Sequence, residues 1–209
     1  MKKIIFIITL LFLSISFFSC TKKEDKTIDI EQRKTDFINE YMYYEDSTNI
    51  PEKWSTWFDY SYFKSQIDKR VFIKLTFDEV KAKIENKESF VIYYGFDPKL
   101  YQCPYCAISI PLVVDVAKEL DIDIYYLDIR QMRVDEDDNY KYLYNLLIRD
   151  LANFPDVIRA STYVNYYEGI ANGFYEGSLK DSEGNNIKEL TDSQKEELRN
   201  IYRSYFLRK

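Results

Sequence analysis

The sequence predicts an α/β fold with a central mixed β-sheet flanked by helices, and with a helical and aromatic extension on its N-terminal side. Two observations predict this class. Between residues 71 and 127, apolar runs typical of strands alternate with segments of helical character, an order that favours parallel strand pairing. Further along the chain, two apolar and aromatic runs flank Glu168-Gly169, and this pattern predicts an antiparallel β-hairpin.

The first residues have the order of a secretory signal. Lys2 and Lys3 precede fifteen uncharged residues, 4–18, and Ser19-Cys20 stands just before a polar stretch. A cysteine at this junction resembles the lipobox of bacterial lipoproteins, which implies that residues 1–19 are removed and that Cys20 carries acyl chains such as palmitate. An uncleaved anchor helix is the alternative, although the run is shorter than the ~20 residues that span a bilayer. Both interpretations place the remaining chain outside the cytoplasm, and the lipobox predicts attachment to the extracytoplasmic face of the cell membrane.

Composition and charge narrow the chemistry and the partners. The chain carries a net charge of −6, and loss of residues 1–19 leaves 27 basic and 35 acidic side chains, so nucleic acid is not an expected partner. No histidine occurs, which excludes Ser-His-Asp and Cys-His catalysis and histidine metal sites. With Cys20 lipidated, the two remaining cysteines are too few for a zinc site. We therefore expect no metal and no cofactor.

The chain divides into four predicted parts. Residues 1–19 form the lipoprotein signal peptide, residues 20–50 a tether and a short amphipathic helix, residues 51–70 an aromatic extension, and residues 71–209 the α/β domain. The amphipathic helix is predicted because its apolar residues share one helical face: Ile30, Phe37, Ile38 and Tyr41. The extension contains both tryptophans, and we expect it to pack against the domain. A peptide-binding groove lined by its aromatic residues is the alternative.

Local patterns predict the elements of the domain in order. Capping boxes at Thr76 and Thr191 predict the starts of two helices. The predicted strands are residues 71–75, 90–94, 122–127, 162–167 and 170–175, and the predicted helices are residues 77–86, 107–120, 135–151 and 192–207. The acidic run at residues 135–138 is expected in a first helical turn, where the helix dipole stabilises negative charge. A calcium site is the alternative, but the run lacks the spacing and the glycine of an EF-hand loop.

The motif Cys103-Pro104-Tyr105-Cys106 stands between a predicted buried strand and a predicted helix. At that place the first sulfur is near free backbone N–H groups and the positive end of the helix dipole, which favour the thiolate. We therefore expect the Cys103 sulfur to be exposed, with a pKa below the ~8.5 of a free cysteine. In an oxidising compartment such a pair either cycles between dithiol and disulfide or forms a structural bridge.

Several spacings resemble those of the thioredoxin superfamily over residues 71–207. Pro111 follows Cys106 by five residues, as does the proline that kinks the active-site helix in that family. Gly169 and Gly177 have the family's eight-residue glycine spacing. Eight residues before Gly169 stands Ser161, at the place of the family's cis-proline. The motif Cys-Pro-Tyr-Cys is itself shared with glutaredoxins.

The stretch from residue 90 to residue 106 looks like the bacteriocin-transport accessory branch of the superfamily. The resemblance implies a thiol–disulfide oxidoreductase in which Cys103 attacks a substrate disulfide and Cys106 resolves the mixed disulfide. The implied partner is a thiol or a disulfide of a protein or peptide. The chain itself is expected to be a monomer. The implied substrate-binding residues are Pro104, Tyr105, Ala160, Ser161 and Thr162. A non-catalytic binding or accessory lipoprotein, in which the disulfide is structural, is the alternative.

Three departures from the family pattern affect this prediction. Ser161 replaces the cis-proline, and because a cis bond before serine costs about 3 kcal/mol, we expect a trans bond there. Ile92 stands where the family keeps a buried aspartate, so the base for the resolving thiol is unassigned, and Glu88 is the suggested substitute. The loop before the first cysteine is longer than in thioredoxin, and we expect its residues 97–101 to restrict access to the sulfur.

Overall fold

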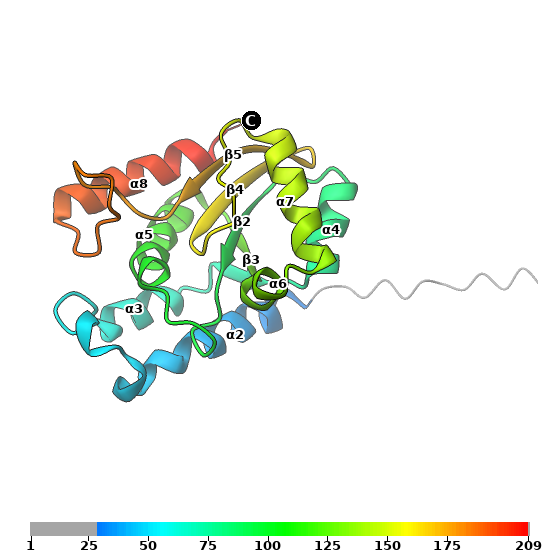
Figure 1. The fold of residues 1–209 in the computed structure, drawn as a ribbon. Coiled ribbons are helices and arrows are strands. Elements are labelled where there is room, and N and C mark those ends of the chain that lie inside the picture. The colour runs from blue at the N-terminus through cyan, green and yellow to red at the C-terminus, as the bar shows by residue number, and fades with distance from the viewer. Residues whose placement is uncertain (1–28, 209) are drawn as a thin grey trace, which may run out of the picture.

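The computed structural model describes residues 29–208, and these form an α/β fold around a five-stranded mixed sheet. The sheet order is β1-β3-β2-β4-β5 (Figure 1). The strand bounds are β1 Phe72–Lys74, β2 Phe90–Gly95, β3 Ile124–Asp128, β4 Thr162–Tyr167 and β5 Ile170–Glu176. The predicted class is confirmed, and the ends of each strand lie within two residues of those predicted.

The central strand β2 joins the parallel half of the sheet to the antiparallel half. Its residue Ile92 pairs in parallel with Tyr125 of β3 and antiparallel with Val164 of β4. β1 pairs in parallel with the other side of β3, and β5 forms a hairpin with β4. Every residue of β2 is buried, as its uninterrupted apolar run predicts. The chain therefore leaves β2 at the carboxyl end of the central strand, and the cysteine motif follows close by.

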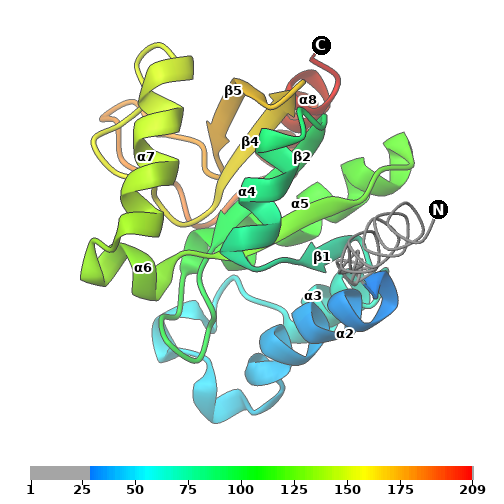
Figure 2. The same cartoon turned by 90° about the vertical axis from the view of Figure 1, so that its right-hand side faces the viewer.

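Residues 29–208 contain seven α-helices around this sheet. Their bounds are α2 Ile30–Tyr41, α3 Tyr60–Ile67, α4 Phe77–Glu85, α5 Pro104–Leu120, α6 Arg130–Asp135, α7 Asp138–Asp150 and α8 Asp192–Phe206. Helices α5 and α8 cover one face of the sheet, and α4 and α7 cover the other (Figures 1 and 2). The chain passes from β2 to β3 through α5, as the predicted strand–helix–strand order requires.

The predicted amphipathic helix is confirmed as α2, which packs along β1. Phe37 of α2 stacks on Phe72 of β1, with 4.5 Å between the ring centroids. The predicted signal peptide, residues 1–19, and the predicted lipid site Cys20 lie outside the described residues. Within residues 29–208, none of the helices has the length and apolar character needed to cross a bilayer.

The aromatic extension, residues 51–70, packs against the domain as expected. It contains a short 3-10 helix, Glu52–Trp54, and the helix α3, which contacts α5. Trp54 and Phe63 are each 1% exposed. Both contact Phe58, with ring centroids 5.7 Å and 5.4 Å away. These aromatic contacts extend the hydrophobic core from the sheet into the extension.

The acidic run at residues 135–138 differs from the prediction. Two helices meet there, because α6 ends at Asp135 and α7 begins at Asp138. Glu136, between them, has a left-handed backbone with φ of 46°. Asp137 caps α7 by accepting the N–H three residues further on, over 2.7 Å. The run is therefore a helix end followed by a cap, and α6 was not predicted.

Candidate functional site

Cys103 and Cys106 lie at the start of α5, beyond the end of the central strand β2. Cys103 is the residue that caps the helix, with φ of −91° and ψ of 107°, and Pro104 is the first helical residue. Proline suits that position because its missing N–H would have no helical partner there. The two sulfurs are at disulfide-bonding distance, and the two Cα atoms are 5.3 Å apart. Because Cys103 is the cap, α5 begins three residues before the predicted start.

The Sγ of Cys103 takes the role that a side-chain oxygen usually has at a helix cap. It accepts a hydrogen bond from the backbone N–H of Cys106 over 3.2 Å. The first N–H groups of a helix lack helical acceptors, and they lie at the positive end of the helix dipole. In the dithiol state the same groups favour the thiolate form of Cys103. The predicted position of this sulfur at a helix start is confirmed.

Both cysteines are buried, with Cys103 3% exposed and Cys106 1% exposed. The expectation of an exposed Cys103 sulfur is therefore wrong for the disulfide state. The chain next to the sulfur is held against the N-terminal part of the molecule. The side-chain Nε2 of Gln102 donates a hydrogen bond to the main-chain oxygen of Asn49 over 2.7 Å.

The segment of residues 97–102, which leads from β2 to the motif, is a compact turn. The N–H groups of Leu100 and Tyr101 both lie 3.0 Å from the carbonyl oxygen of Asp97, to which they donate. The guanidinium group of Arg130 lies 5.1 Å from the centre of the Tyr101 ring. This ordered turn leads directly to Gln102 and Cys103, and the expectation that it restricts access to the sulfur stays a prediction.

The five predicted substrate-binding residues differ in accessibility. Pro104, Tyr105 and Ala160 are half-buried, whereas Ser161 and Thr162 are 1% and 0% exposed. Thr162 is the first residue of β4, where its backbone pairs with β2 and β5. The carbonyl of Ser161 also has a partner within the chain. The prediction that Ser161 and Thr162 offer backbone groups to a substrate stays a prediction, with the Ser161 carbonyl already bonded within the chain.

Ser161 lies in the turn before β4 in a left-handed conformation, with φ of 68°. Its carbonyl oxygen accepts the N–H of Gly177 over 2.6 Å. No peptide bond within residues 29–208 is cis, so the expected trans bond before Ser161 is confirmed. A Cβ atom on Gly177 would lie 2.2 Å from the Oγ of Ser161, which explains why glycine is needed there.

Three buried hydroxyl groups lie next to the cysteine motif, and we call Ser109, Ser161 and Tyr163 the hydroxyl cluster. The Oγ of Ser109 lies 2.8 Å from the Oγ of Ser161 and 3.0 Å from the OH of Tyr163. The Oγ of Ser109 also lies 3.4 Å from the carbonyl oxygen of Cys106, and the Oγ of Ser161 lies 3.4 Å from that of Tyr105. This cluster was not predicted. Its one local signal is a serine within an otherwise apolar stretch of α5.

The suggested base for the resolving thiol is not at the site. Ile92 is fully buried in β2, as its place in the apolar run predicts. Glu88 precedes β2, at the end of the strand opposite the cysteines, and its carboxylate pairs with Lys83 over 2.7 Å. The six residues of β2 span about 20 Å of extended chain. The suggestion that Glu88 serves as the base for Cys106 is therefore wrong.

Glu40 of α2 is a buried carboxyl group that was not singled out from the sequence. It is 5% exposed, and it is hydrogen-bonded to the ammonium group of Lys74 and to the hydroxyl group of Tyr126. Burial raises the pKa of Glu40, and its two partners act in the opposite direction. These contacts attach α2 to β1 and β3.

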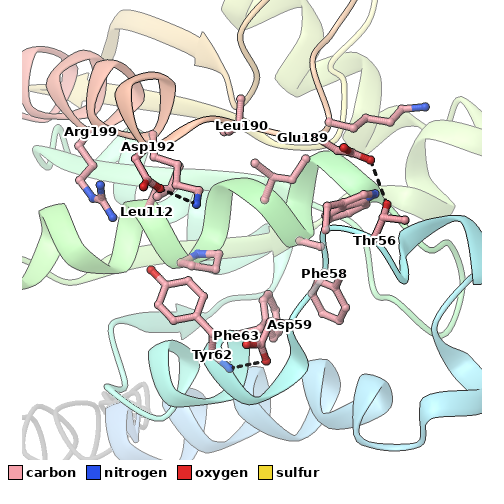
Figure 3. Close-up of a pocket in the computed structure, with 16 residues that line it drawn as sticks. Thr56, Phe58, Asp59, Tyr62, Phe63, Leu112, Glu189, Leu190, Asp192 and Arg199 are labelled. Atoms are coloured by element: carbon pink, nitrogen blue, oxygen red, sulfur yellow. Dashed lines mark hydrogen bonds and ion pairs between the residues drawn. The ribbon is translucent and has the colours of Figure 1, made fainter.

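An open groove of about 780 Å³ runs beside α5. Figure 3 shows α5 between two walls, one from α3 and the residues before it and one from α8 and the residues before it. At one end the walls are joined, because Thr56 donates a hydrogen bond to Glu189 over 2.9 Å (Figure 3). Four aromatic residues of the extension line the groove: Trp57, Phe58, Tyr62 and Phe63. That they bind a peptide there, the alternative given for this segment, stays a prediction. The groove also reaches Ala107, the residue after Cys106.

Comparison with known proteins finds no family model and no curated protein that matches this chain. Among residues 29–208, no three side chains of the His, Cys, Asp and Glu types are grouped to hold a metal ion. The cysteine pair at the start of α5 therefore stands as the candidate site on its own geometry.

Proposed function

We propose that this chain is a thioredoxin-like thiol–disulfide oxidoreductase, tethered through Cys20 to the extracytoplasmic face of the cell membrane. The observation that carries the proposal is the disulfide at the start of α5, in which the Cys103 sulfur accepts the N–H of Cys106. The mixed sheet, with α5 following its central strand, and the proline within α5, Pro111, agree with a thioredoxin-like fold.

In the proposed reaction the dithiol form reduces a disulfide of a protein or peptide. The Cys103 thiolate attacks one substrate sulfur, the substrate S–S bond breaks, and the released substrate thiolate takes up a proton. Cys106 then loses its proton and attacks the Cys103 sulfur, which breaks the mixed disulfide and releases the second substrate thiol. Two electrons pass to the substrate, and the cysteine pair becomes a disulfide. The reverse sequence oxidises a substrate dithiol, and the reduction potentials of the pair and its partner set the direction.

Exchange requires an opening of the site, because Cys103 is 3% exposed in the disulfide state. We assign this opening to the segment of residues 97–102. Gln102 holds the end of the segment next to Cys103 through one neutral hydrogen bond to Asn49. Such a bond contributes about 1 kcal/mol net, and loops held by few contacts open locally at small free-energy cost.

The proposal is tested by turnover. Purified protein is assayed for reduction of a protein disulfide with dithiothreitol as the electron source. We expect Cys103→Ala to abolish the activity, since the remaining Cys106 has no partner thiol with which to close a disulfide and release the substrate. Cys20→Ser is the control, and it keeps full activity in solution because Cys20 lies outside the exchange mechanism. Activity that persists unchanged in Cys103→Ala rules out the proposed chemistry.

Membrane attachment has a separate test. Cells that produce the wild-type chain and cells that produce Cys20→Ala are separated into membrane and soluble fractions. We expect the wild-type protein in the membrane fraction and the variant in the soluble fraction, because the variant has no sulfur to carry the lipid. Equal distribution of the two proteins contradicts attachment through Cys20.

A second function, that of a non-catalytic binding or accessory lipoprotein, is favoured by the burial of both cysteines. In this case the disulfide braces the start of α5, and the groove beside α5 holds a peptide. Ile108, a half-buried residue of the groove, provides the test. Saturable peptide binding that Ile108→Lys removes, together with a lack of turnover, selects this function over exchange.

A further inference from the structure

The hydroxyl cluster lies directly beneath the Cys-Pro-Tyr-Cys turn. Ser109, Ser161 and Tyr163 are 0%, 1% and 1% exposed. Ser109 belongs to α5, Ser161 to the turn before β4, and Tyr163 to β4 itself. Buried hydroxyl groups in proteins almost always have hydrogen-bond partners, and here Ser109 is the partner of both Ser161 and Tyr163. The cluster therefore links the helix that carries the cysteines to the antiparallel half of the sheet.

The hydrogen bonds of the cluster end on the main chain of the motif. In an assignment that places all three protons, Tyr163 donates to Ser109, Ser109 to Ser161, and Ser161 to the carbonyl oxygen of Tyr105. Ser109 lies within reach of a second acceptor, the carbonyl oxygen of Cys106. Both acceptors belong to residues of the turn that closes the disulfide. The cluster thus lies 3.4 Å from two consecutive carbonyl oxygens of the turn, and in this assignment it donates to the one of Tyr105.

The surroundings leave no spare room for this arrangement. A Cβ atom on Gly177 would lie 2.2 Å from the Oγ of Ser161 and 2.8 Å from the Cβ of Ser109. Gly177 in turn donates its N–H to the carbonyl oxygen of Ser161. The close fit restricts the positions that the two serine hydroxyl groups can adopt.

We propose that Ser109, Ser161 and Tyr163 are positioning residues that hold the cysteine turn in its disulfide geometry and thereby favour the disulfide over the dithiol. Closure of a disulfide needs the two Cα atoms within about 4.4–6.8 Å, and those of Cys103 and Cys106 are 5.3 Å apart. Reduction removes the covalent link, and the turn then keeps this geometry only through its non-covalent contacts. Without the cluster the reduced turn relaxes, so the equilibrium moves toward the dithiol. The proposal deepens the exchange function and rests on it for its catalytic consequence.

The test is the equilibrium of the cysteine pair with reduced and oxidised glutathione, read by thiol trapping and mass spectrometry. Ser109→Ala and Tyr163→Phe each remove one hydroxyl group of the cluster. The matched control is Tyr166→Phe, because Tyr166 also lies in β4, is also 1% exposed, and loses a hydrogen bond to Tyr94 of 3.1 Å. We expect Ser109→Ala and Tyr163→Phe to shift the equilibrium about fivefold toward the dithiol, and Tyr166→Phe to leave it unchanged.

A merely structural role would lower the resistance to urea by the same amount in Tyr163→Phe and Tyr166→Phe and would leave the glutathione equilibrium alone. Three outcomes overturn the proposal. The glutathione equilibrium of Ser109→Ala and Tyr163→Phe stays unchanged, it shifts toward the disulfide, or it shifts equally in Tyr166→Phe. The measurement needs no substrate turnover, so it separates this proposal from the proposed function. If the wild-type protein shows no turnover, the exchange function is rejected. If the glutathione equilibrium of the cluster variants equals that of the wild type, the role of the cluster is rejected.

Discussion

The backbone N–H of Cys106 points at the Sγ of Cys103 over 3.2 Å, so the first cysteine caps the helix that carries the second. A serine or aspartate oxygen at this place would stabilise the helix start in a similar way. A sulfur adds a group that can lose a proton and form a covalent bond. The helix start and the redox state of the pair are therefore coupled within four residues.

We expect the pKa of Cys103 in the reduced protein to lie below the ~8.5 of a free cysteine, because the helix start stabilises the thiolate. The thiolate is the form that reacts with iodoacetamide, so the pH dependence of alkylation at Cys103 reports this pKa. A Cys20→Ser chain and peptide mass spectrometry separate Cys103 from the other thiols. The same chain unfolded in guanidinium is the control, and a native midpoint at or above the unfolded midpoint contradicts the prediction.

Removal of the Gln102 side chain is expected to make the disulfide easier to reach. Gln102→Ala loses the hydrogen bond to Asn49 and frees the segment before Cys103. Because this bond contributes about 1 kcal/mol net, the rate constant for reduction by dithiothreitol should rise about fivefold. Gln32→Ala is the control, since it removes an exposed 2.8 Å side-chain bond on α2. Equal reduction rates for the two variants would show that Gln102 does not hold the segment of residues 97–102 over the disulfide.

Gly177→Ala is expected to destabilise the fold, because the new Cβ atom would meet Ser161 and Ser109 at 2.2 Å and 2.8 Å. Forcing a methyl group into such a packed site lowers the unfolding free energy by about 1–3 kcal/mol. Gly173→Ala is the comparison, since the atom closest to the new Cβ is in the guanidinium group of Arg208, 3.0 Å away. The end of that flexible side chain can move aside. Urea unfolding measures both variants, and a loss in Gly173→Ala as large as in Gly177→Ala is the contrary result.

Glu40 is expected to affect how stability depends on pH. Burial raises its pKa in the folded chain above the ordinary value of 4.5. The stabilisation from such a group is complete below pH 4.5 and is lost as the pH rises through the folded pKa. The unfolding free energy of Glu40→Gln, measured relative to the wild type, should therefore increase as the pH rises through this window.

Glu119 provides a comparison of opposite sign for that experiment. A hydrogen bond from Arg203 lowers the pKa of Glu119, so its stabilisation is present at higher pH and is lost as the pH falls. Relative to the wild type, Glu119→Gln should become less stable as the pH rises. A difference for Glu40→Gln that stays constant or falls with pH contradicts the role given to burial.

Local sequence signals were sufficient for most of the fold. The buried run of β2, the capping box at Thr76 and the turn at Glu168-Gly169 each depend on residues close together in the chain. The cap formed by Cys103 is local as well, and the position of its sulfur at a helix start could therefore be predicted.

The features that escaped prediction depend on contacts between distant residues. The burial of Cys103 goes with a bond between Gln102 and Asn49, which are 53 positions apart. The hydroxyl cluster joins Ser109 to Ser161 across 52 positions, and no local pattern connects the two serines. Local sequence patterns do not encode such contacts, since these form only when α5, β4 and the segment that contains Asn49 are in place.

The most direct test of the central claim, a Cys103 sulfur that exchanges with substrate disulfides, is a trapping experiment on the Cys106→Ala chain. Cys20→Ser is included, so that Cys103 is the one remaining thiol. The folded protein is mixed with a peptide disulfide, and intact mass spectrometry follows the mixed disulfide. We predict that the peptide is captured on Cys103 in the folded protein, and that release is slow because the resolving thiol is missing. If only guanidinium-unfolded protein captures the peptide, the sulfur is closed off in the native state and the exchange mechanism is contradicted.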